Sequence, residues 1–499
     1  MPTSENTQPD APLPPSRREM LRSLACGVGG IGLAAVLAQE AAAGQEDPAP
    51  QGPAPQGPAP QGPVPAGRAP GAPGPHHAAK ARSLIFLNMM GGPTQFETFD
   101  YKPEMAKWAG KTAGAISKDG MVRANPEAKV LPPLFRYVRK GEAGLATTEV
   151  FPHMAEVLDE LCVIRTMVAD SPAHPAGQKQ AMTGFARQAM PSFGSWILYG
   201  LGSANRNLPG FVHLAEGNHH GSGFLPATTQ GMPIGHRIPN LKVPAGLVGG
   251  QRGQLDLLAD LNRGFAERNP GEDVLAARIE AAELAFRMQT ACPEAVDIAK
   301  ESPATLALYG IDGGKPGRAK AVARSLTYSR ADLATMCLVA RRLVERGVRV
   351  ITICVGGRRG WDQHKDLKEA VAHNAGIIDQ PIAALLRDLR GRGLLDSTLV
   401  MWGGEFGRTP YAQNDNGRDH FAKGFTYWLA GGGSRRGTMY GLTDDIGQNI
   451  VQDPVHIHDL HATVLHLMGL DPDRLTFRYA GRDQRLTDVS GRVIPGLLA

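Results

Sequence analysis

From residue 83 onward the chain repeats one pattern: a short apolar run, a turn rich in glycine, and a longer amphipathic stretch. A short apolar run bounded by turn residues is typical of a buried strand. Strands that alternate with helices favour a mostly parallel sheet covered on both faces. The alternation therefore predicts an α/β fold. The expected strands span residues 83–92, 160–167, 210–216, 348–357, 397–404 and 425–433, and the expected helices span 272–300, 318–346 and 366–393.

The composition leaves room for a large core and argues against two classes of protein. The chain has 499 residues, 42% of them hydrophobic, and a formal net charge of only +5. No basic stripe is interleaved with aromatic residues, so nucleic acid is not an expected partner. Five cysteines do not make a disulfide framework at this length. Cys162, Cys337 and Cys354 lie in apolar segments and are expected to be buried thiols.

The first 43 residues resemble a twin-arginine (Tat) export signal. Arg17 and Arg18 precede a stretch rich in glycine and alanine, and the alanines at 41–43 fit a cleavage site. The alternative is an uncleaved membrane anchor, but a stable span needs about 20 strongly apolar residues. We therefore expect a periplasmic or extracellular protein with no transmembrane span after signal cleavage.

The next segment, residues 44–80, is rich in proline and glycine and contains repeats of "PAPQG". Such a segment has too few apolar side chains to fold and is expected to be an extended, disordered linker. The folded domain is expected to span 81–499. Within it, residues from about 209 to 316 differ in composition and are interpreted as an insertion or a cap.

Carboxylates and imidazoles recur beside three successive expected strands in the second half of the chain. Ligands of parallel sheets gather at the carboxyl ends of the strands, so these side chains are expected to share one cation. Each has a simpler reading alone, such as a surface loop or an ion pair with a neighbouring arginine. The set is harder to explain by coincidence. Its members are Asp362 and His364 in "GGRRGWDQH", Glu405 in "GGEFGRTP", and Asp419 and His420 in "GRDHF".

A further group of histidines lies in "PVHIHDLHATVLHLMGL" near the C-terminus. His456 or His458 is a candidate metal ligand, and we take His458 forward. In the alternative reading Asp459 caps the following helix, while His461 and His466 pack on its faces. Mixed carboxylate and histidine ligands suit zinc, manganese or iron better than calcium alone.

These motifs together resemble a bacterial family. "ETFD", "GGRRGWDQH", "GGEFGRTP", "GRDHF" and the C-terminal "HDLHATVLHLMGLD" and "GRDQRLTDVSG" are similar to family DUF1501, which has Tat-exported members. The resemblance covers about residues 80–497, and the family is grouped with the alkaline phosphatase and sulfatase superfamily. It implies an alkaline-phosphatase-like three-layer α/β sandwich. It also implies cleavage of phosphate or sulfate esters with one or two metal ions and a hydroxyl or modified cysteine nucleophile.

Position by position, the resemblance implies a first metal held by Asp362, His364 and His420. The Asp-x-His spacing is shorter than the superfamily's usual spacing. Glu405 looks like the carboxylate of a second metal, but Phe406 stands where a histidine or asparagine ligand would be. That departure puts a complete second metal site in doubt.

The resemblance also implies an aspartate directly after the first strand, but this sequence has none there. Met89 and Met90 follow the strand, so Asp100 or Glu97 would have to reach back to the metal. In the alternative reading Asp100 is a turn carboxylate.

The nucleophile and the oxyanion donor also follow from the resemblance. Ser171 in "DSPAHP" is the candidate nucleophile, with Asp170 and His174 nearby, and a Ser-Pro turn that caps a helix is the alternative. Arg408, or Arg418, could stabilise a transferred oxyanion or could orient a metal-binding carboxylate. No Cys-x-Pro-x-Arg motif occurs, which disfavours a formylglycine sulfatase.

The leading expectation is an exported metal-dependent hydrolase of phosphate or sulfate esters, with a small-molecule or glycan substrate. It would use one or two divalent ions, with zinc expected before manganese, iron or calcium. The alternative is a catalytically degenerate, metal-stabilised exported protein that binds a partner or belongs to the envelope.

Overall fold

The computed structural model describes most of the chain from residue 73 onward. The export signal expected at 1–43 lies outside the described residues, as do most of the expected linker and parts of the expected helices 272–300 and 318–346. The described residues are 73–116, 125–215, 220–234, 250–268, 283–284, 286–288, 291–311, 325–356, 360–414 and 416–499.

The chain divides into two compact units. The larger contains residues 59–237 and 294–499, and the smaller includes residues 238–293. In the smaller unit the main described element is α7 (Gly250–Arg268), whose Arg252 forms ion pairs with Asp256 and Glu283. Among the described residues, no helix is both long and apolar enough to cross a membrane.

A nine-stranded sheet forms the centre of the larger unit. All six expected strands belong to it, and β1 is buried along its whole length, as its mostly apolar sequence predicts. From edge to edge the order is β12 (Thr438–Tyr440), β4 (Leu161–Val168), β11 (Lys423–Ala430), β8 (Thr398–Gly403), β1 (Ser83–Met89), β7 (Val350–Val355), β5 (Phe211–His213) and β6 (Met232–Pro233), and β15 (Val455–His456) also pairs with β4.

The strands of the sheet are mostly parallel. β1 pairs in parallel with β7 and β8, whereas β11 is antiparallel to both of its neighbours, β4 and β8. Since β4 and β8 both run opposite to β11, they run in the same direction as each other. The carboxyl ends of β4, β8, β1 and β7 therefore lie at the same edge of the sheet.

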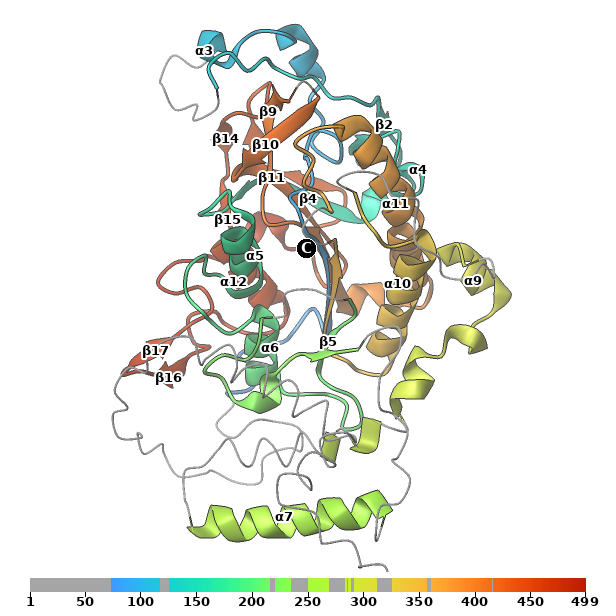
Figure 1. Ribbon diagram of the computed structural model, residues 1–499, viewed down its shortest axis with the longest axis vertical. Coiled ribbons are helices and arrows are strands. Elements are labelled where there is room, and N and C mark those ends of the chain that lie inside the picture. The colour runs from blue at the N-terminus through green and yellow to red at the C-terminus, as the bar shows by residue number, and fades with distance from the viewer. Residues whose placement is uncertain are drawn as a thin grey trace, which may run out of the picture. The chain divides into compact units, whose positions relative to one another are not determined.

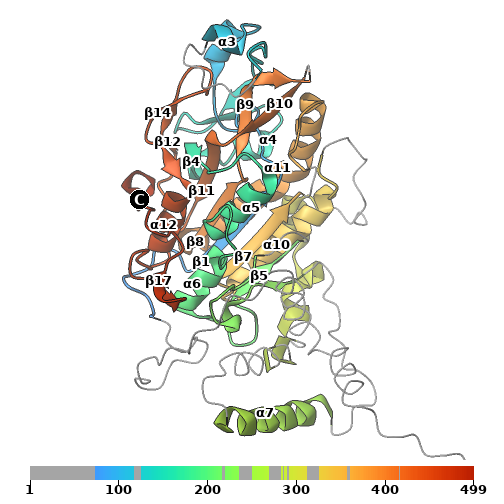
Figure 2. The ribbon, with the colours of Figure 1, turned by 60° about the vertical axis from the view of Figure 1, so that its left-hand side comes forward.

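Helices cover both faces of the sheet and give a three-layer α/β architecture. Figures 1 and 2 show α5, α6 and α12 on one face and α10 and α11 on the other. Leu84 and Phe86 of β1 share a core cluster with Trp196 of α6 and Val464 of α12. These helices are α5 (His174–Thr183), α6 (Phe193–Leu201), α12 (Ile457–Leu467), α10 (Arg330–Glu345) and α11 (Leu367–Gly391).

Several helices begin at side-chain caps that the sequence supplies. At α10, Ser329 and Asp332 form a reciprocal capping box. At α12, the Asp459 carboxylate accepts from the backbone N–H of His456 at 3.0 Å, so Asp459 does cap this helix.

Smaller elements surround these layers. The hairpin of β9 and β10 matters most, because it extends beyond the carboxyl edge of the sheet (Figure 1). The smaller elements are β9 (Gly407–Gln413), β10 (Gly417–Phe421), β2 (Tyr137–Arg139), β3 (Ala146–Thr148), β13 (Leu442–Thr443), β14 (Ile450–Gln452), β16 (Phe477–Tyr479), β17 (Arg482–Gln484), α3 (Ala113–Ile116), α4 (Pro152–Ala155) and α9 (Pro303–Tyr309).

Candidate metal centre

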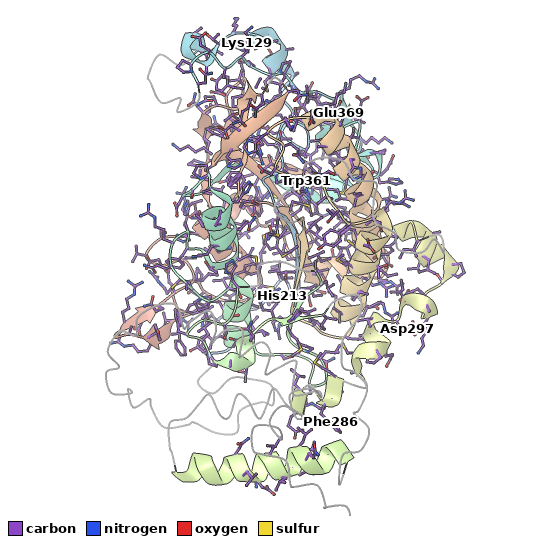
Figure 3. The ribbon with its side chains drawn as sticks, viewed as in Figure 1. Lys129, His213, Phe286, Asp297, Trp361 and Glu369 are labelled. Carbon is purple, nitrogen blue, oxygen red and sulfur yellow. The ribbon has the colours of Figure 1, made fainter. Side chains whose placement is uncertain are left out.

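The loops after three strands, together with one hairpin, bring the site residues together at the carboxyl edge of the sheet. His174 begins α5 after β4, Asp362 and His364 follow β7, Glu405 follows β8, and His420 lies on β10 opposite Arg408. Figure 3 labels Trp361, the residue before Asp362, towards the end of the molecule where β9 and β10 lie. His213 of β5 is labelled further down the sheet.

Three imidazoles converge on one carboxylate oxygen. The Oδ1 atom of Asp362 lies 3.1 Å from Nε2 of His174, 2.8 Å from Nε2 of His364 and 3.1 Å from Nε2 of His420. Ligands bound about 2.0–2.2 Å from a tetrahedral ion lie roughly 3.3–3.5 Å from one another. The ligand atoms of His174, Asp362 and His420 all lie within 4.8 Å of one another, close enough to share an ion, and His364 approaches the same Asp362 oxygen.

The other nitrogen of each imidazole faces an oxygen acceptor. Nδ1 of His420 lies 2.7 Å from the Pro172 carbonyl oxygen. Nδ1 of His174 lies 2.7 Å from the Glu405 carboxylate, and Nδ1 of His364 lies 2.5 Å from Oε1 of Gln413.

These contacts assign the tautomer of each ring. An acceptor opposite Nδ1 requires a hydrogen there, so each neutral ring carries its lone pair on Nε2. Three lone pairs then point at the Asp362 carboxylate. The Nε2 lone pairs and the carboxylate oxygen repel one another unless a proton or a cation lies between them. The residues therefore fit a bound cation.

The electrostatics of the site favour positive charge. Burial lowers the pKa of His174, but its hydrogen bonds to Asp362 and Glu405 outweigh burial and raise it to about 9. Burial raises the pKa of Asp362, but the three histidines and Arg408 hold it well below its usual range. Without a metal, the raised pKa of His174 favours a protonated ring at neutral pH. A divalent cation would balance the negative charge of Asp362 and Glu405 in the same way.

Arg408 joins the loops that carry the site. Its guanidinium is fully buried and lies 3.0 Å from Oδ1 of Asp362. It also donates to the carbonyl oxygens of Gly91, Gly92, Trp361 and Arg418. All three guanidinium nitrogens therefore have protein acceptors. This placement matches the expectation that an arginine here orients a carboxylate, although the carboxylate is Asp362.

Glu405 lies behind His174, on the opposite side of the ring from Asp362. Its buried carboxylate accepts from the backbone N–H of Gly91 at 2.9 and 3.1 Å, from His174 at 2.7 Å and from Gln178 at 3.3 Å. Among the described residues, two groups of acids and histidines lie close enough to share an ion, and neither includes Glu405. A carboxylate in this position orients a metal-binding histidine.

Asp419 belongs to the second of these groups, with His364 and His420. Its side chain is 52% exposed, and its Oδ1 lies 3.9 Å from Nδ1 of His364. The same oxygen accepts from the backbone N–H of His420 at 2.8 Å. Asp419 therefore lies at the rim of the centre.

Asp100 and His458 have partners elsewhere in the fold. Asp100 is fully buried, 3.7 Å from Nζ of Lys102 and 3.8 Å from the Arg165 guanidinium. His458 lies 2.6 Å from the Ser490 hydroxyl and 2.7 Å from a backbone carbonyl oxygen. Neither residue belongs to the two groups that could share an ion among the described residues.

Ser171 lies beside the centre, on the loop between β4 and α5. Its hydroxyl accepts from the backbone N–H of Ala173 at 3.2 Å, the contact expected of a Ser-Pro turn. The carbonyl oxygen of Pro172 in the same loop holds His420.

His174 is the residue that the sequence placed least well. The sequence motif indicates it only as a neighbour of Ser171, yet it belongs to the first of the two possible metal-binding groups. The available signal was its position directly after a strand and its loop, where a helix starts. The same rule that selected Asp362 would have selected it.

Gly91→Ala tests the close approach of two loops at the site. A Cβ atom here would lie 2.4 Å from the backbone nitrogen of Trp361, and the residue has φ of +113°. We expect a loss of about 2–4 kcal/mol in the free energy of unfolding, from backbone strain plus displacement of the Asp362 loop. Urea unfolding measures it.

Gly110→Ala is the matched control, because its φ is +77° and nothing lies within 4 Å of the added atom. It should cost only about 1 kcal/mol. Equal losses in the two variants would contradict the close approach at Gly91.

The fold and the site define an α/β protein with a His/Asp cluster at the carboxyl edge of a mostly parallel sheet. The chain belongs to the family described as a protein of unknown function, DUF1501, whose model matches residues 81–498. This confirms the family expected from the motifs. No curated protein matches the sequence.

Several solved structures resemble the chain distantly. Lipoteichoic acid synthase LtaP from Listeria monocytogenes aligns over 83% of this chain and 76% of its own, with 8% identity and a TM-score of 0.31. A phosphonate monoester hydrolase from Agrobacterium radiobacter aligns over 83% and 77%, with 11% identity and a TM-score of 0.34. PsFucS1 sulfatase from Pseudoalteromonas sp. aligns over 64% and 62%, with 14% identity and a TM-score of 0.30. Similarity this low does not support any inference about function. The function has to be argued from the site.

Proposed function

We propose that this chain is an exported, metal-dependent hydrolase of phosphate or sulfate esters. One observation carries the proposal: three imidazoles, each held through Nδ1, direct Nε2 at the Asp362 carboxylate from separate loops. The export part rests on the twin-arginine signal at 1–43, and the ester chemistry on the superfamily resemblance.

His174, His364, His420 and Asp362 would hold the ion. Three imidazoles and one carboxylate suit zinc, and also manganese or iron, whereas calcium prefers oxygen ligands throughout. A divalent ion would polarise an ester oxygen and lower the pKa of an attacking water or hydroxyl.

The surrounding residues would position these ligands and the nucleophile. Glu405, Gln413 and the Pro172 carbonyl oxygen fix the three imidazoles, and Arg408 fixes Asp362. Ser171 is the proposed nucleophile because its loop carries both Pro172 and His174. We propose that Asp419 lies at the rim of the site, where a substrate enters.

The second candidate is an exported metal-stabilised protein without catalysis, which binds a partner or a glycan. Two observations favour it. The Ser171 hydroxyl already closes a local turn, and every nitrogen of the Arg408 guanidinium already meets a protein acceptor. Neither group is thus free to act on a substrate without rearrangement.

Metal content and turnover distinguish the two candidates. Purified protein should contain a divalent metal by elemental analysis and should cleave some of a panel of phosphate, phosphonate and sulfate esters. His420→Ala should reduce metal content by at least tenfold and abolish turnover, because it removes one of four ligands. Ser171→Ala should abolish turnover while the metal stays.

His466→Ala is the matched control, since this ring lies on α12 and packs at a tilt against His77, with the centroids 4.5 Å apart, away from the centre. It should retain both metal and turnover. Metal without turnover on any ester would favour the non-catalytic protein, and absence of metal would reject both candidates.

A further inference from the structure

The segment directly after β8 closes one side of the proposed metal centre. Phe406 is 1% exposed, and its ring centroid lies 4.9 Å from that of His174 and 4.5 Å from that of His420. An apolar ring thus packs against two of the three imidazoles. Space on that side of the histidines is filled by carbon, which cannot bind an ion.

The Phe406 ring is held tightly in this position. A Cβ atom added at Gly92 would lie 2.7 Å from the ring, and one added at Gly177 of α5 would lie 3.2 Å from it. The ring therefore fits only because these two positions, one after β1 and the other on α5, have no side chain. Moving the ring aside would require moving a strand end or a helix.

Glu405, the acid beside this ring, already accepts from three donors. Its side chain is fully buried, and both carboxylate oxygens accept from the backbone N–H of Gly91 at 2.9 and 3.1 Å. Oε1 also meets His174 at 2.7 Å and Gln178 at 3.3 Å. An ion at Glu405 would have to displace these donors in a buried site, at the cost of their unsatisfied N–H groups.

The group of His364, Asp419 and His420 does not supply a separate second site. It shares His420 with the first group. Its other histidine, His364, already directs Nε2 at the Asp362 oxygen of that group, 2.8 Å away. The Nδ1 atoms of the two histidines are already held by Gln413 and by the Pro172 carbonyl oxygen. Asp419 alone would be left to bind an additional ion.

We propose that the centre binds a single divalent ion, with Phe406 occupying the place of a second one and Glu405 acting through His174 as a positioning residue. This inference rests on the metal centre proposed above, but it does not depend on any hydrolytic activity. Of the one or two ions implied by the family resemblance, this inference selects one. It also assigns Glu405 a role outside the coordination shell.

Stoichiometry and spectroscopy test this inference. Apo protein is titrated with Zn²⁺ by calorimetry, loaded with Co²⁺ for its visible spectrum and loaded with Mn²⁺ for its paramagnetic resonance. Wild type should bind one ion per chain, with the strong Co²⁺ absorption of a four-coordinate site and a resonance signal that shows no coupling between ions. Two ions per chain, or a coupled Mn²⁺ signal, would overturn the inference.

Glu405→Gln separates a positioning residue from a ligand. The variant should still bind one ion with the same Co²⁺ spectrum, but 10- to 100-fold more weakly, as expected when a group that orients a ligand is changed. A changed coordination spectrum would show that Glu405 is a ligand and would reject its positioning role. Phe406→Leu, which keeps an apolar side chain in this place, should also bind one ion per chain.

The outcomes separate this inference from the proposed function. One ion per chain without ester cleavage would leave the inference standing and reject the hydrolase. Ester cleavage with two ions would do the reverse. No ion at all would reject both. Thermal unfolding of each variant identifies any that fail to fold, and wild-type stoichiometry decides the one-ion question without them.

Discussion

Replacing Arg408 with methionine is expected to lower the free energy of unfolding by about 3–5 kcal/mol and to weaken metal binding. The guanidinium is fully buried and is the donor for four backbone carbonyl oxygens and for Asp362. Methionine fills a similar volume but donates nothing. Buried carbonyl groups and the Asp362 carboxylate would therefore lose their partner, and each unsatisfied group costs about 1–3 kcal/mol. Denaturant unfolding and Zn²⁺ titration measure the two effects.

Arg436→Met provides the control for this prediction. Arg436 also pairs with a carboxylate, that of Glu160, but its side chain is 52% exposed. An exposed pair contributes about 0–1 kcal/mol, so the control should remain near wild-type stability and bind metal normally. Similar losses in both variants would mean that Arg408 does not hold the site loops together.

The sequence predicted the central strands well because their signal is local. In a run such as "SLIFLNM", which is followed by glycines, both alternating faces are mostly apolar, as in a strand buried on both faces. The order of the strands is not local. β11 lies between β4 and β8 and is antiparallel to both, although more than 250 residues separate it from β4. Nothing in the β11 segment identifies that partner.

The sequence predicted which residues lie near the candidate site better than it predicted the role of each residue there. Nε2 of His364 and of His420 lie 2.8 and 3.1 Å from Oδ1 of Asp362. Asp362 and His364 follow β7, and His420 lies on the hairpin that follows the nearby parallel strand β8, so all three meet at one edge of the sheet. Glu405 and His174 were harder to assign. The sequence locates both at that edge, but it does not say which side chain faces the centre and which stands behind the other.

The other difficult assignments concern side chains whose hydrogen-bond partners come from distant parts of the chain. His458 lies among histidines at the start of α12, where its ring reaches Ser490 and a backbone carbonyl oxygen. Arg408 was expected to meet a carboxylate or an oxyanion. Most of its acceptors are backbone carbonyls from separate loops, and backbone groups carry no sequence signal.

A buried ion pair beneath the β9–β10 hairpin gives the second large expected effect. Arg418 of β10 and Glu97 are both fully buried, with Nη2 of Arg418 2.8 Å from Oε1 of Glu97. Arg418 also donates to the carbonyl oxygens of Leu131 and Thr409, and its guanidinium lies over the ring of Phe96. Removal of either partner alone, by Arg418→Met or Glu97→Leu, should cost about 3–5 kcal/mol, because it leaves a buried charge unpaired.

The double variant Arg418→Met with Glu97→Leu should be clearly more stable than the sum of the single losses predicts. Replacing a buried pair by apolar residues removes both desolvation costs together, and such changes range from neutral to stabilising by about 1–4 kcal/mol. Urea unfolding of the four proteins gives the coupling energy. Strictly additive losses would mean that the pair is not coupled. Because Arg418 lies two residues before His420, the Arg418 variants should also bind Zn²⁺ more weakly than wild type. Unchanged affinity would mean that other contacts hold the hairpin in place.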